Sequence, residues 1–378
     1  MRLGIGDDSA VLRPPANSEW VVSCDFSLEN VHFRVATHPP ASIGYRCLAR
    51  ATSDIAAMGA RPRYFLLALA LPAEKTSAAK GANWLDSFSS GLARAARDLD
   101  MLLIGGDITV SPSVTISVTV LGELPPGFAI SRSGARPGDL IYASGTLGAA
   151  QLGLQLLLRG LTGNPAAAKL LQPHLYPRIP IALAQALARR RIPSAMMDIS
   201  DGLSTDLARL CESSRVGARL HADELPCVNI PTAIANYYWH SEPTRPVSSE
   251  QKGSPESVRS SSGHGFSRAV INTGTVRLQP LRDVLGPSQS SAPDPTAYSF
   301  KEPAVLDPLQ LALHGGEDYA LLFTVPPKRA PLLRAIAAKT KTRITHIGEI
   351  TRSRKILLVD SDGRSSPLAP RGWNPFRE

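Results

Sequence analysis

Aspartates stand beside glycine or a small hydroxyl residue at four separated places in this chain. These are Gly6-Asp7-Asp8-Ser9, Ser23-Cys24-Asp25, Gly105-Gly106-Asp107 and Asp198-Ile199-Ser200-Asp201. We interpret the neighbouring apolar stretches as strands, and the ends of strands are where ligands bind in open α/β sheets. We therefore expect these carboxylates to converge on one cleft, together with Asp54 from an intervening helix.

Carboxylates gathered in one cleft repel one another unless cations keep them ionised. Magnesium suits such a site because it prefers oxygen ligands and is usually held by a few carboxylates together with substrate phosphates. Metal ions so placed neutralise the charge that develops in phosphoryl transfer. The adjacent glycines would let backbone N–H groups approach phosphate oxygens. The pattern predicts magnesium-dependent phosphoryl transfer.

Each of these motifs taken alone is more often a turn than a ligand site. Their repeated placement is what favours a shared function. The sequence has no GxxxxGK[ST] phosphate loop, no protein-kinase catalytic-loop set and no Gly-x-Ser-x-Gly elbow. The common nucleotide-binding folds and the serine-hydrolase elbow are therefore not indicated.

Composition favours a globular enzyme of two domains, since 378 residues with 43% hydrophobic and 19% charged residues can form two cores. No apolar stretch reaches the roughly 18 residues of a membrane span, and the N-terminus has no signal pattern, so we expect a cytoplasmic protein without a membrane partner. The four cysteines form no CxxC pair, which argues against a disulfide framework or a zinc site. The net charge of +9 is scattered and aromatics are few, which argues against nucleic-acid binding.

Changes of hydrophobic period predict two α/β domains, at 1–135 and 136–378. In the first we expect extended chain over 20–33, a helix over 41–58, a strand over 62–72, a helix over 79–98, and strands over 101–105 and 114–120. In the second we expect strands over 140–143, 196–199 and 320–325, helices over 147–159 and 331–339, and a closing pair of strands. Between about 229 and 303 the chain is rich in Ser, Pro and Gly, which predicts a mobile insertion.

Seven motifs, in this order and spacing, resemble those of the thiamine-monophosphate kinase family. They are Gly4-Ile5-Gly6-Asp7-Asp8, Asn30-Val31-His32-Phe33, Ser53-Asp54-Ile55-Ala56-Ala57-Met58-Gly59-Ala60, Gly105-Gly106-Asp107, Ser131-Arg132-Ser133-Gly134, Asp198-Ile199-Ser200-Asp201-Gly202-Leu203 and Gly315-Gly316-Glu317-Asp318-Tyr319. The similarity covers nearly the whole chain apart from the insertion.

The resemblance implies a two-domain aminoimidazole ribonucleotide synthetase-like fold of the α/β (α+β) class. Its N-terminal domain would be a mixed sheet with helices that forms the core of a homodimer, and its C-terminal domain would be α/β. The implied reaction is direct transfer of the ATP γ-phosphate to thiamine monophosphate, which gives thiamine diphosphate and ADP. ATP would be the co-substrate, and several Mg²⁺ ions would be required.

The resemblance also implies a role for each matching residue. The metal ligands would be Asp8, Ser23, Cys24, Asp25, Asp54, Asp107, Asp198 and Asp201. ATP would be contacted by Gly106, Asp107, Arg132 and Ser200, and thiamine monophosphate by His32, Glu317 and Trp373. The chemistry of the residues agrees, because arginine clamps phosphate, tryptophan stacks on a cationic ring and a glutamate balances its charge. No dedicated general base is needed, since the acceptor phosphate is already ionised.

This chain departs from the family pattern in four ways. Cys24 stands where a hydroxyl residue is usual, so that a metal contact there would come from its backbone carbonyl, and Ile108 stands where threonine is usual. The helix that normally precedes the first motif is missing, which indicates a truncated start, and the insertion lies just before the Gly-Gly-Glu-Asp motif. Two alternatives stay open: an aminoimidazole ribonucleotide synthetase-type enzyme, or a non-catalytic nucleotide-binding relative.

Overall fold

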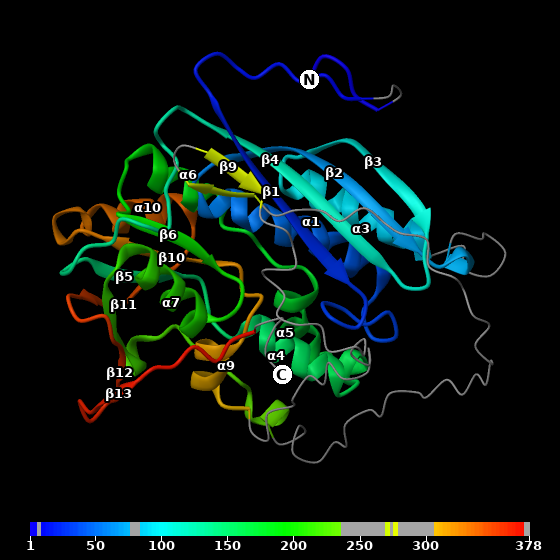
Figure 1. Cartoon of the computed structure of the whole chain (residues 1–378). Coiled ribbons are helices and arrows are strands. Elements are labelled where there is room, and N and C mark those ends of the chain that lie inside the picture. The colour runs from blue at the N-terminus through cyan, green and yellow to red at the C-terminus, as the bar shows by residue number, and fades with distance from the viewer. Residues whose placement is uncertain (6–8, 76–83, 236–268, 273–274, 279–305, 374–378) are drawn as a thin grey trace. The chain divides into compact units, whose positions relative to one another are not determined.

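The computed structural model describes residues 1–5, 9–75, 84–235, 269–272, 275–278 and 306–373. The chain divides into two compact units, one formed by Met1–Thr244 with Lys301–Glu378 and the other by Arg245–Phe300. In the described part of the chain, no helix is long and apolar enough to cross a membrane. The first unit contains two sheets, and each has helices packed against it (Figure 1).

The first sheet is a mixed sheet of four strands in the order β1-β4-β2-β3. Its strands are β1 (Glu19–Leu28), β2 (Arg61–Leu71), β3 (Leu102–Val110) and β4 (Thr115–Leu124). The strand β4 pairs with β1 and β2 in antiparallel fashion, and β2 pairs with β3 in parallel. In β4 the predicted alternation holds, because Ile116, Val118 and Val120 are buried on one face.

Two helices, α1 (Pro40–Ala57) and α3 (Trp84–Asp98), pack together and cover one face of this sheet (Figure 1). Proline at the first position of α1 starts the helix without losing a hydrogen bond, and Gly59 ends it with a φ of 76°. The two helices approach so closely at Gly91 that a Cβ there would collide with the carbonyl oxygen of Ala41. On the opposite, open face of the sheet, β1 exposes Val22 and Phe26.

The second sheet has seven strands in the order β13-β12-β7-β11-β5-β10-β6. Its strands are β5 (Leu140–Ser144), β6 (Ala195–Ile199), β7 (Gly217–His221), β10 (Ala320–Val325), β11 (Ile344–Thr351), β12 (Ile356–Val359) and β13 (Ser365–Pro367). Only β12 and β7 pair in parallel, so this sheet is also mixed. Strands from both sides of the insertion belong to this sheet, since β10, which follows the insertion, pairs with β5 and β6, which precede it.

In the described part of the chain, six helices accompany the second sheet. They are α4 (Ala149–Leu158), α5 (Pro165–Leu175), α6 (Ile181–Arg189), α7 (Leu203–Ser214), α9 (Pro308–His314) and α10 (Leu332–Thr340). The helix α7 begins directly after the Ser200-Asp201-Gly202 turn that follows β6. A buried cluster of apolar side chains from α6, β6 and β10 also includes Ala56 of α1, so the two halves of the unit share core contacts.

The expectation that Asp25 and Asp107 end their strands is wrong. The strand β1 continues to Leu28 and β3 continues to Val110. Both are edge strands, where polar side chains can point into solvent while the backbone still pairs with its neighbour. The apolar residues of each sequence stretch end before these aspartates. The hydrogen-bonded strands nevertheless continue past them.

The predicted insertion at 229–303 lies mostly outside the described residues. Within it, β8 (Ala269–Asn272) and β9 (Thr275–Leu278) form an antiparallel pair. The mobility of the insertion stays a prediction. Asp8 also lies outside the described residues. The boundary between domains at residues 135 and 136 stays a prediction.

Replacing Gly91 with alanine should reduce the free energy of unfolding by about 1–3 kcal/mol, because the new methyl group must push α1 and α3 apart. Urea unfolding of the Gly91→Ala variant measures this. Gly163→Ala is the control, since nothing lies within 4 Å of a Cβ at that glycine. Equal effects of the two substitutions would contradict the close helix contact.

Candidate active site

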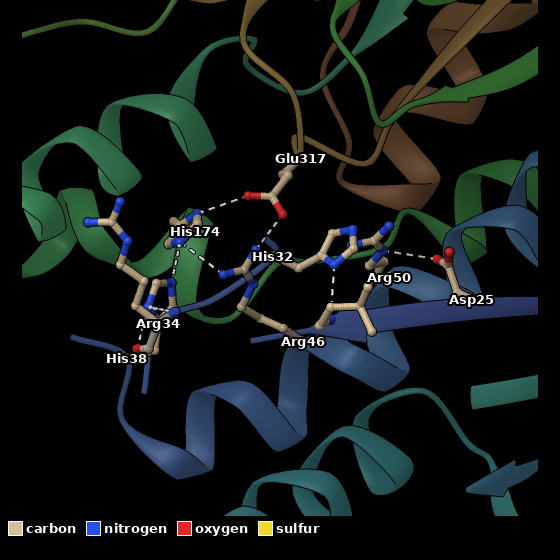
Figure 2. Close-up of polar contacts among 9 residues, drawn as sticks. Asp25, His32, Arg34, His38, Arg46, Arg50, His174 and Glu317 are labelled. Atoms are coloured by element: carbon tan, nitrogen blue, oxygen red, sulfur yellow. Dashed lines mark hydrogen bonds and ion pairs between the residues drawn. The ribbon is translucent and has the colours of Figure 1, made fainter. Parts of the chain in front are cut away.

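The helix α1 carries only three charged residues, Arg46, Arg50 and Asp54, which are spaced by four and form one stripe along the helix. Each meets a partner from another part of the chain. Arg46 Nη2 lies 2.6 Å from Glu317 Oε1, Arg50 Nε lies 3.1 Å from Asp25 Oδ2, and Ser23 Oγ donates a hydrogen bond of 2.5 Å to Asp54 Oδ2. Figure 2 shows the two arginine pairs. The stripe therefore orders the polar groups of the site.

Asp25 and Asp198 each lie close enough to Asp54 for their charges to interact with it, and we refer to Asp25, Asp54 and Asp198 as the acidic cluster. They belong to β1, α1 and β6, respectively, and Ser53 Oγ donates a hydrogen bond of 2.7 Å to Asp198 Oδ2. Burial, and then the neighbouring charge of Asp25, raises the pKa of Asp54. Burial, and then Asp54, raises the pKa of Asp198 to about 7. The cluster therefore carries a like-charge repulsion that a bound cation would relieve.

Arg132 is exposed, and its guanidinium opposes the rise in the pKa of Asp54. This places a positive charge close enough to the acidic cluster to act on it. Arginine forms bidentate hydrogen bonds with phosphate, so the pairing of Arg132 with the cluster suits an anion held between them by metal ions.

The turn that carries Ser200 and Asp201 is shaped by a buried carboxylate, Asp206 of α7. Asp206 Oδ2 accepts hydrogen bonds of 3.0 Å from the backbone N–H groups of both Ser200 and Asp201. Arg209 pairs with Asp201 and lies 3.0 Å from Asp206 Oδ1. The Asp201 carboxylate is therefore held by an arginine rather than by the acidic cluster.

Trp373 packs against His32. The backbone N–H of Trp373 donates a hydrogen bond of 3.0 Å to the carbonyl of Asp201, and the ring centroids of Trp373 and His32 lie 5.6 Å apart. His32 Nδ1 accepts a hydrogen bond of 3.0 Å from the backbone N–H of Leu28. Burial, and then the charge of Arg50, lowers the pKa of His32 to about 3, so this imidazole is neutral. His32, Arg46 and Arg50 also line one small pocket.

Glu317 belongs to a backbone segment with unusual geometry, because Glu317 and Tyr319 have φ values of 70° and 48°. Their N–H groups donate hydrogen bonds to the carbonyls of Ser200 (2.8 Å) and Ile199 (2.9 Å). Asp318, between them, turns away and caps α4 by accepting hydrogen bonds from the N–H groups of Gly148 (2.6 Å) and Ala150 (3.0 Å). Asp318 is thus structural, while Glu317 faces the site.

Glu317 Oε2 lies 3.3 Å from His174 Nδ1, and we call Arg46, His174, His38 and Glu317 the Glu317 network (Figure 2). Burial alone would raise the pKa of Glu317, but Arg46 and His174 outweigh it and hold this pKa well below the ordinary value. Glu317 is therefore a charged group whose countercharge is already in place.

Other predicted site residues lie elsewhere in the chain. Asp25 lines up across the sheet with Gly106, but β1 and β3 are opposite edges, about 14 Å apart at the usual strand spacing. Asp107 is exposed on β3. The side chain of Cys24 lies 3.4 Å from the hydroxyls of Ser117 and Thr119 on the open face, so a metal contact from its sulfur is not supported.

Gly106 has a φ of 152°, and a Cβ there would collide with the carbonyl of Leu67.

Among the described residues, no group of three or more His, Cys, Asp or Glu is close enough to hold a metal ion. A single copy of the described chain therefore assembles part of the predicted metal site.

Sequence reasoning missed the residues that surround the predicted ones. They are His38, Arg46, Arg50, His174, Asp206 and Arg209. The four-residue spacing of Arg46, Arg50 and Asp54 in an otherwise uncharged helix was a usable signal. His174 gave none, because its contacts in space come from residues 128 and 136 positions away.

Comparison with known proteins places this geometry in a family. The N-terminal domain of AIR synthase related proteins matches residues 6–124, and their C-terminal domain matches residues 136–259. The chain is therefore a two-domain AIR synthase-like α/β protein, which confirms the predicted fold class.

Thiamine-monophosphate kinase of Escherichia coli strain K12 is 32% identical over 378 residues, which cover 100% of this chain and 92% of that protein. The crystal structure of thiamine-monophosphate kinase from Stenotrophomonas maltophilia K279a has a TM-score of 0.68 at 31% identity and covers 96% of this chain and 92% of that one. A structure named AaThiL complexed with AMPPCP and TMP has a TM-score of 0.66 at 26% identity and covers 98% and 92%. The chain belongs to the thiamine-monophosphate kinase family, as its motifs predicted.

The pKa of Glu317 predicts how stability depends on pH. Its folded-state pKa lies below the ordinary value of 4.5, so the stability from the charged form is fully present above that pH and is lost as pH falls through and below it. We expect the wild-type protein to exceed Glu317→Gln in free energy of unfolding by a constant amount from pH 8 to 6 and by less at pH 4. Urea titrations measure both.

The matched control for this prediction is Glu349→Gln, which removes an exposed ion pair with Arg219. Its effect should stay within about 0.5 kcal/mol at every pH, as is usual for surface pairs. A wild-type advantage over Glu317→Gln that grows as pH falls would contradict the assignment.

Proposed function

We propose that this chain, an enzyme of the thiamine-monophosphate kinase family, transfers the γ-phosphate of ATP directly to thiamine monophosphate at the acidic cluster. The observation that carries the proposal is the cluster itself. Asp25, Asp54 and Asp198 come from three different elements, and the charge of Arg132 acts on Asp54. A phosphoryl-transfer site needs such oxygen ligands and such a cation.

The cluster fits magnesium by the chemistry of its donors. All are oxygens, and burial together with mutual repulsion raises the pKa of Asp54 and Asp198, a cost that a divalent cation offsets. Mg²⁺ is usually held by one or two carboxylates together with substrate phosphates. We therefore propose Asp25, Asp54 and Asp198 as ligands of several ions that the substrate phosphates complete, with Ser23 beside them, and keep Asp8, Asp107, Asp201 and the Cys24 carbonyl as further candidates. Bound Mg²⁺ would supply charge neutralisation for the transferring phosphoryl group.

The chain's own residues then bind and orient the two substrates. Arg132, Ser200 and Gly106 are the proposed contacts to ATP, and Ser200 is held in place by Asp206. His32, Trp373 and Glu317 are the proposed contacts to thiamine monophosphate, whose ring would pack against the two aromatic side chains. The neighbouring structure solved with AMPPCP and TMP supports both substrate classes.

No side chain has to remove a proton from the acceptor, because a phosphate oxygen is already ionised near neutral pH. Catalysis would come from in-line positioning and from charge stabilisation. A reaction that consumes ATP also fits the cytoplasmic location expected from the sequence.

Two alternatives have less support. An aminoimidazole ribonucleotide synthetase-type enzyme shares the fold, but the full-length similarity to thiamine-monophosphate kinases favours the proposed reaction. A non-catalytic relative would gain nothing from burying several repelling carboxylates together.

Purified protein with ATP, Mg²⁺ and thiamine monophosphate should form thiamine diphosphate, measured by chromatography. Asp54→Asn should lower kcat on the order of 100-fold, because it removes an oxygen ligand from the charge-stabilising site. Asp86→Asn, an exposed position on α3, is the matched control and should keep wild-type activity. Product formation that needs no Mg²⁺, or full activity in Asp54→Asn, would refute this assignment of the site.

We infer further that the functional form is a two-fold dimer built on the first sheet. Its open face exposes Val22, Phe26 and Leu66, and the edge strand β3 exposes Ile108 and Val110. Exposed apolar side chains next to unpaired strand edges are typical of a surface that another chain covers. We propose that a second copy of the chain covers this surface. In one copy Asp107 lies at the far edge of the sheet from Asp25, so that the predicted set of metal ligands is incomplete.

A two-fold axis would place the β3 edge of one copy beside the β1 edge of the other, since closing two open sheets removes both edges. The partner's Asp107 would then stand near Asp25, although the two are at opposite edges of one sheet. This arrangement reconciles the predicted ligand set with the single-chain geometry.

Subunit mixing tests this arrangement. Asp25→Asn and Asp107→Asn should each be nearly inactive, but co-expressed with different tags they should recover about a quarter of wild-type activity, because half of the dimers hold one intact site. Recovery equal to the sum of the separate variants would show that both residues act within one chain. Light scattering of each variant confirms that dimers form.

A further inference from the structure

Beyond the proposed substrate contacts, the Glu317 network joins four side chains from separate parts of the chain. Arg46 comes from α1, His38 from the turn before it, His174 from α5 and Glu317 from the segment before β10. Arg46 and both histidines are buried. Figure 2 shows the Glu317 carboxylate with Arg46 on one side and His174 on the other.

The hydrogen bonds fix the proton positions in this network. Arg46 Nη1 lies 2.9 Å from His174 Nε2, and since a guanidinium can only donate, Nε2 must accept. His174 then carries its proton on Nδ1, which lies 3.3 Å from Glu317 Oε2. His38 Nε2 lies 3.0 Å from the same accepting nitrogen and must donate to it. Arg46 and His174 therefore both place an N–H group close to the Glu317 carboxylate, Arg46 through a hydrogen bond and His174 Nδ1 at 3.3 Å.

Several contacts fix the position of Glu317. One carboxylate oxygen faces Arg46, the other faces His174, and the backbone N–H is bonded to Ser200. Its left-handed backbone conformation costs about 1–3 kcal/mol, a strain usually kept only where function needs it. Arg46 also lines the small pocket with His32, so the fixed carboxylate and the His32–Trp373 pair border the same space.

We propose that Arg46 and His174 are positioning residues that hold the Glu317 carboxylate toward the cationic ring of the acceptor substrate, opposite the His32–Trp373 pair. This inference rests on the proposed function. It assigns to the network the selection of a positively charged acceptor, while the acidic cluster and Arg132 serve the phosphates.

A purely structural role for the network makes a different prediction. It would lower stability and impair the use of both substrates together when Arg46 is lost. A positioning role affects the binding of thiamine monophosphate alone, because Glu317 has no assigned contact with ATP. The two roles are therefore separated by comparing the KM values for the two substrates.

The test uses full-length Arg46→Met, Arg46→Lys and His174→Gln, with Arg61→Met as the matched control for an exposed arginine pair. We expect Arg46→Met to raise the KM for thiamine monophosphate about tenfold or more while the KM for ATP changes less than about twofold. Arg46→Lys should recover most of the loss, because lysine keeps the charge. Arg61→Met should leave both KM values unchanged.

The pH dependence of the KM for thiamine monophosphate also separates the two roles, because a purely structural role would leave it unchanged. Without Arg46, burial of Glu317 is less opposed, so its pKa rises and the carboxylate becomes protonated as pH falls. The ratio of KM for thiamine monophosphate between Arg46→Met and wild type should grow from pH 8 to pH 6. For Glu317→Gln the same ratio should be flat.

Other charged or titratable groups face Glu317 and must not cause this trend. They are Arg46 and Arg50 of α1, His32, His38, His174 of α5, and Asp318 and Tyr319 in its own segment. In wild type the pKa values of His32, His38 and His174, about 3, about 2 and about 4, lie below the window. Burial raises the pKa of Asp318 to about 7, but this group is present in all variants and cancels in the ratio.

The outcomes separate the two proposals. If wild-type protein makes no thiamine diphosphate and binds no thiamine monophosphate by calorimetry, the proposed function fails and the inference with it. If wild type is active and Arg46→Met keeps its KM for thiamine monophosphate, the inference alone is overturned. Parallel increases in both KM values, with a lowered Tm, would assign the network a structural role and also overturn it.

Discussion

The charge stripe of α1 is the constraint on which the rest of the site depends. Arg46, Arg50 and Asp54 follow one another at four-residue spacing on a helix that is otherwise uncharged and packed on a sheet. Because these side chains are shielded from water, each needs an oppositely charged or hydrogen-bonding partner within the protein. Those partners come from β1 and from the segment before β10, so a single helix sets the relative positions of groups more than 250 residues apart, as the separation of 271 between Arg46 and Glu317 shows.

Opposite electrostatic conditions hold at the two ends of this stripe. At Asp54, like charges gather and raise one another's pKa, which leaves a site that gains from a cation. At Arg46, a carboxylate is surrounded by donors and stays charged, which leaves a site that is already balanced. The first arrangement leaves a repulsion that a bound cation would relieve, whereas the second fixes one carboxylate in place beforehand. Both suit a reaction in which positioning and charge do most of the catalysis.

Much of the site was readable from motifs, but its connections were not. The sequence predicted Asp25, Asp54, Asp198, His32 and Trp373, and the structure brings three of these carboxylates together and sets Trp373 against His32. The sequence did not predict a role for His174, because a lone histidine in a helix is indistinguishable from an ordinary core residue until its neighbours are known. Asp206 was missed for the same reason, since its role lies in bonds to the backbone of the preceding turn.

The sequence by itself determined the α/β class, most element positions and the family, because hydrophobic period and glycine-flanked acids are local patterns that survive without a fold. Only the tertiary structure decided that Asp107 lies at the opposite sheet edge from Asp25, that Asp201 pairs with Arg209, and that Glu317 is paired with Arg46. Strand order, strand length at an edge and long-range ion pairs depend on which surfaces meet. They arise from contacts between distant segments, and no local pattern encodes those contacts.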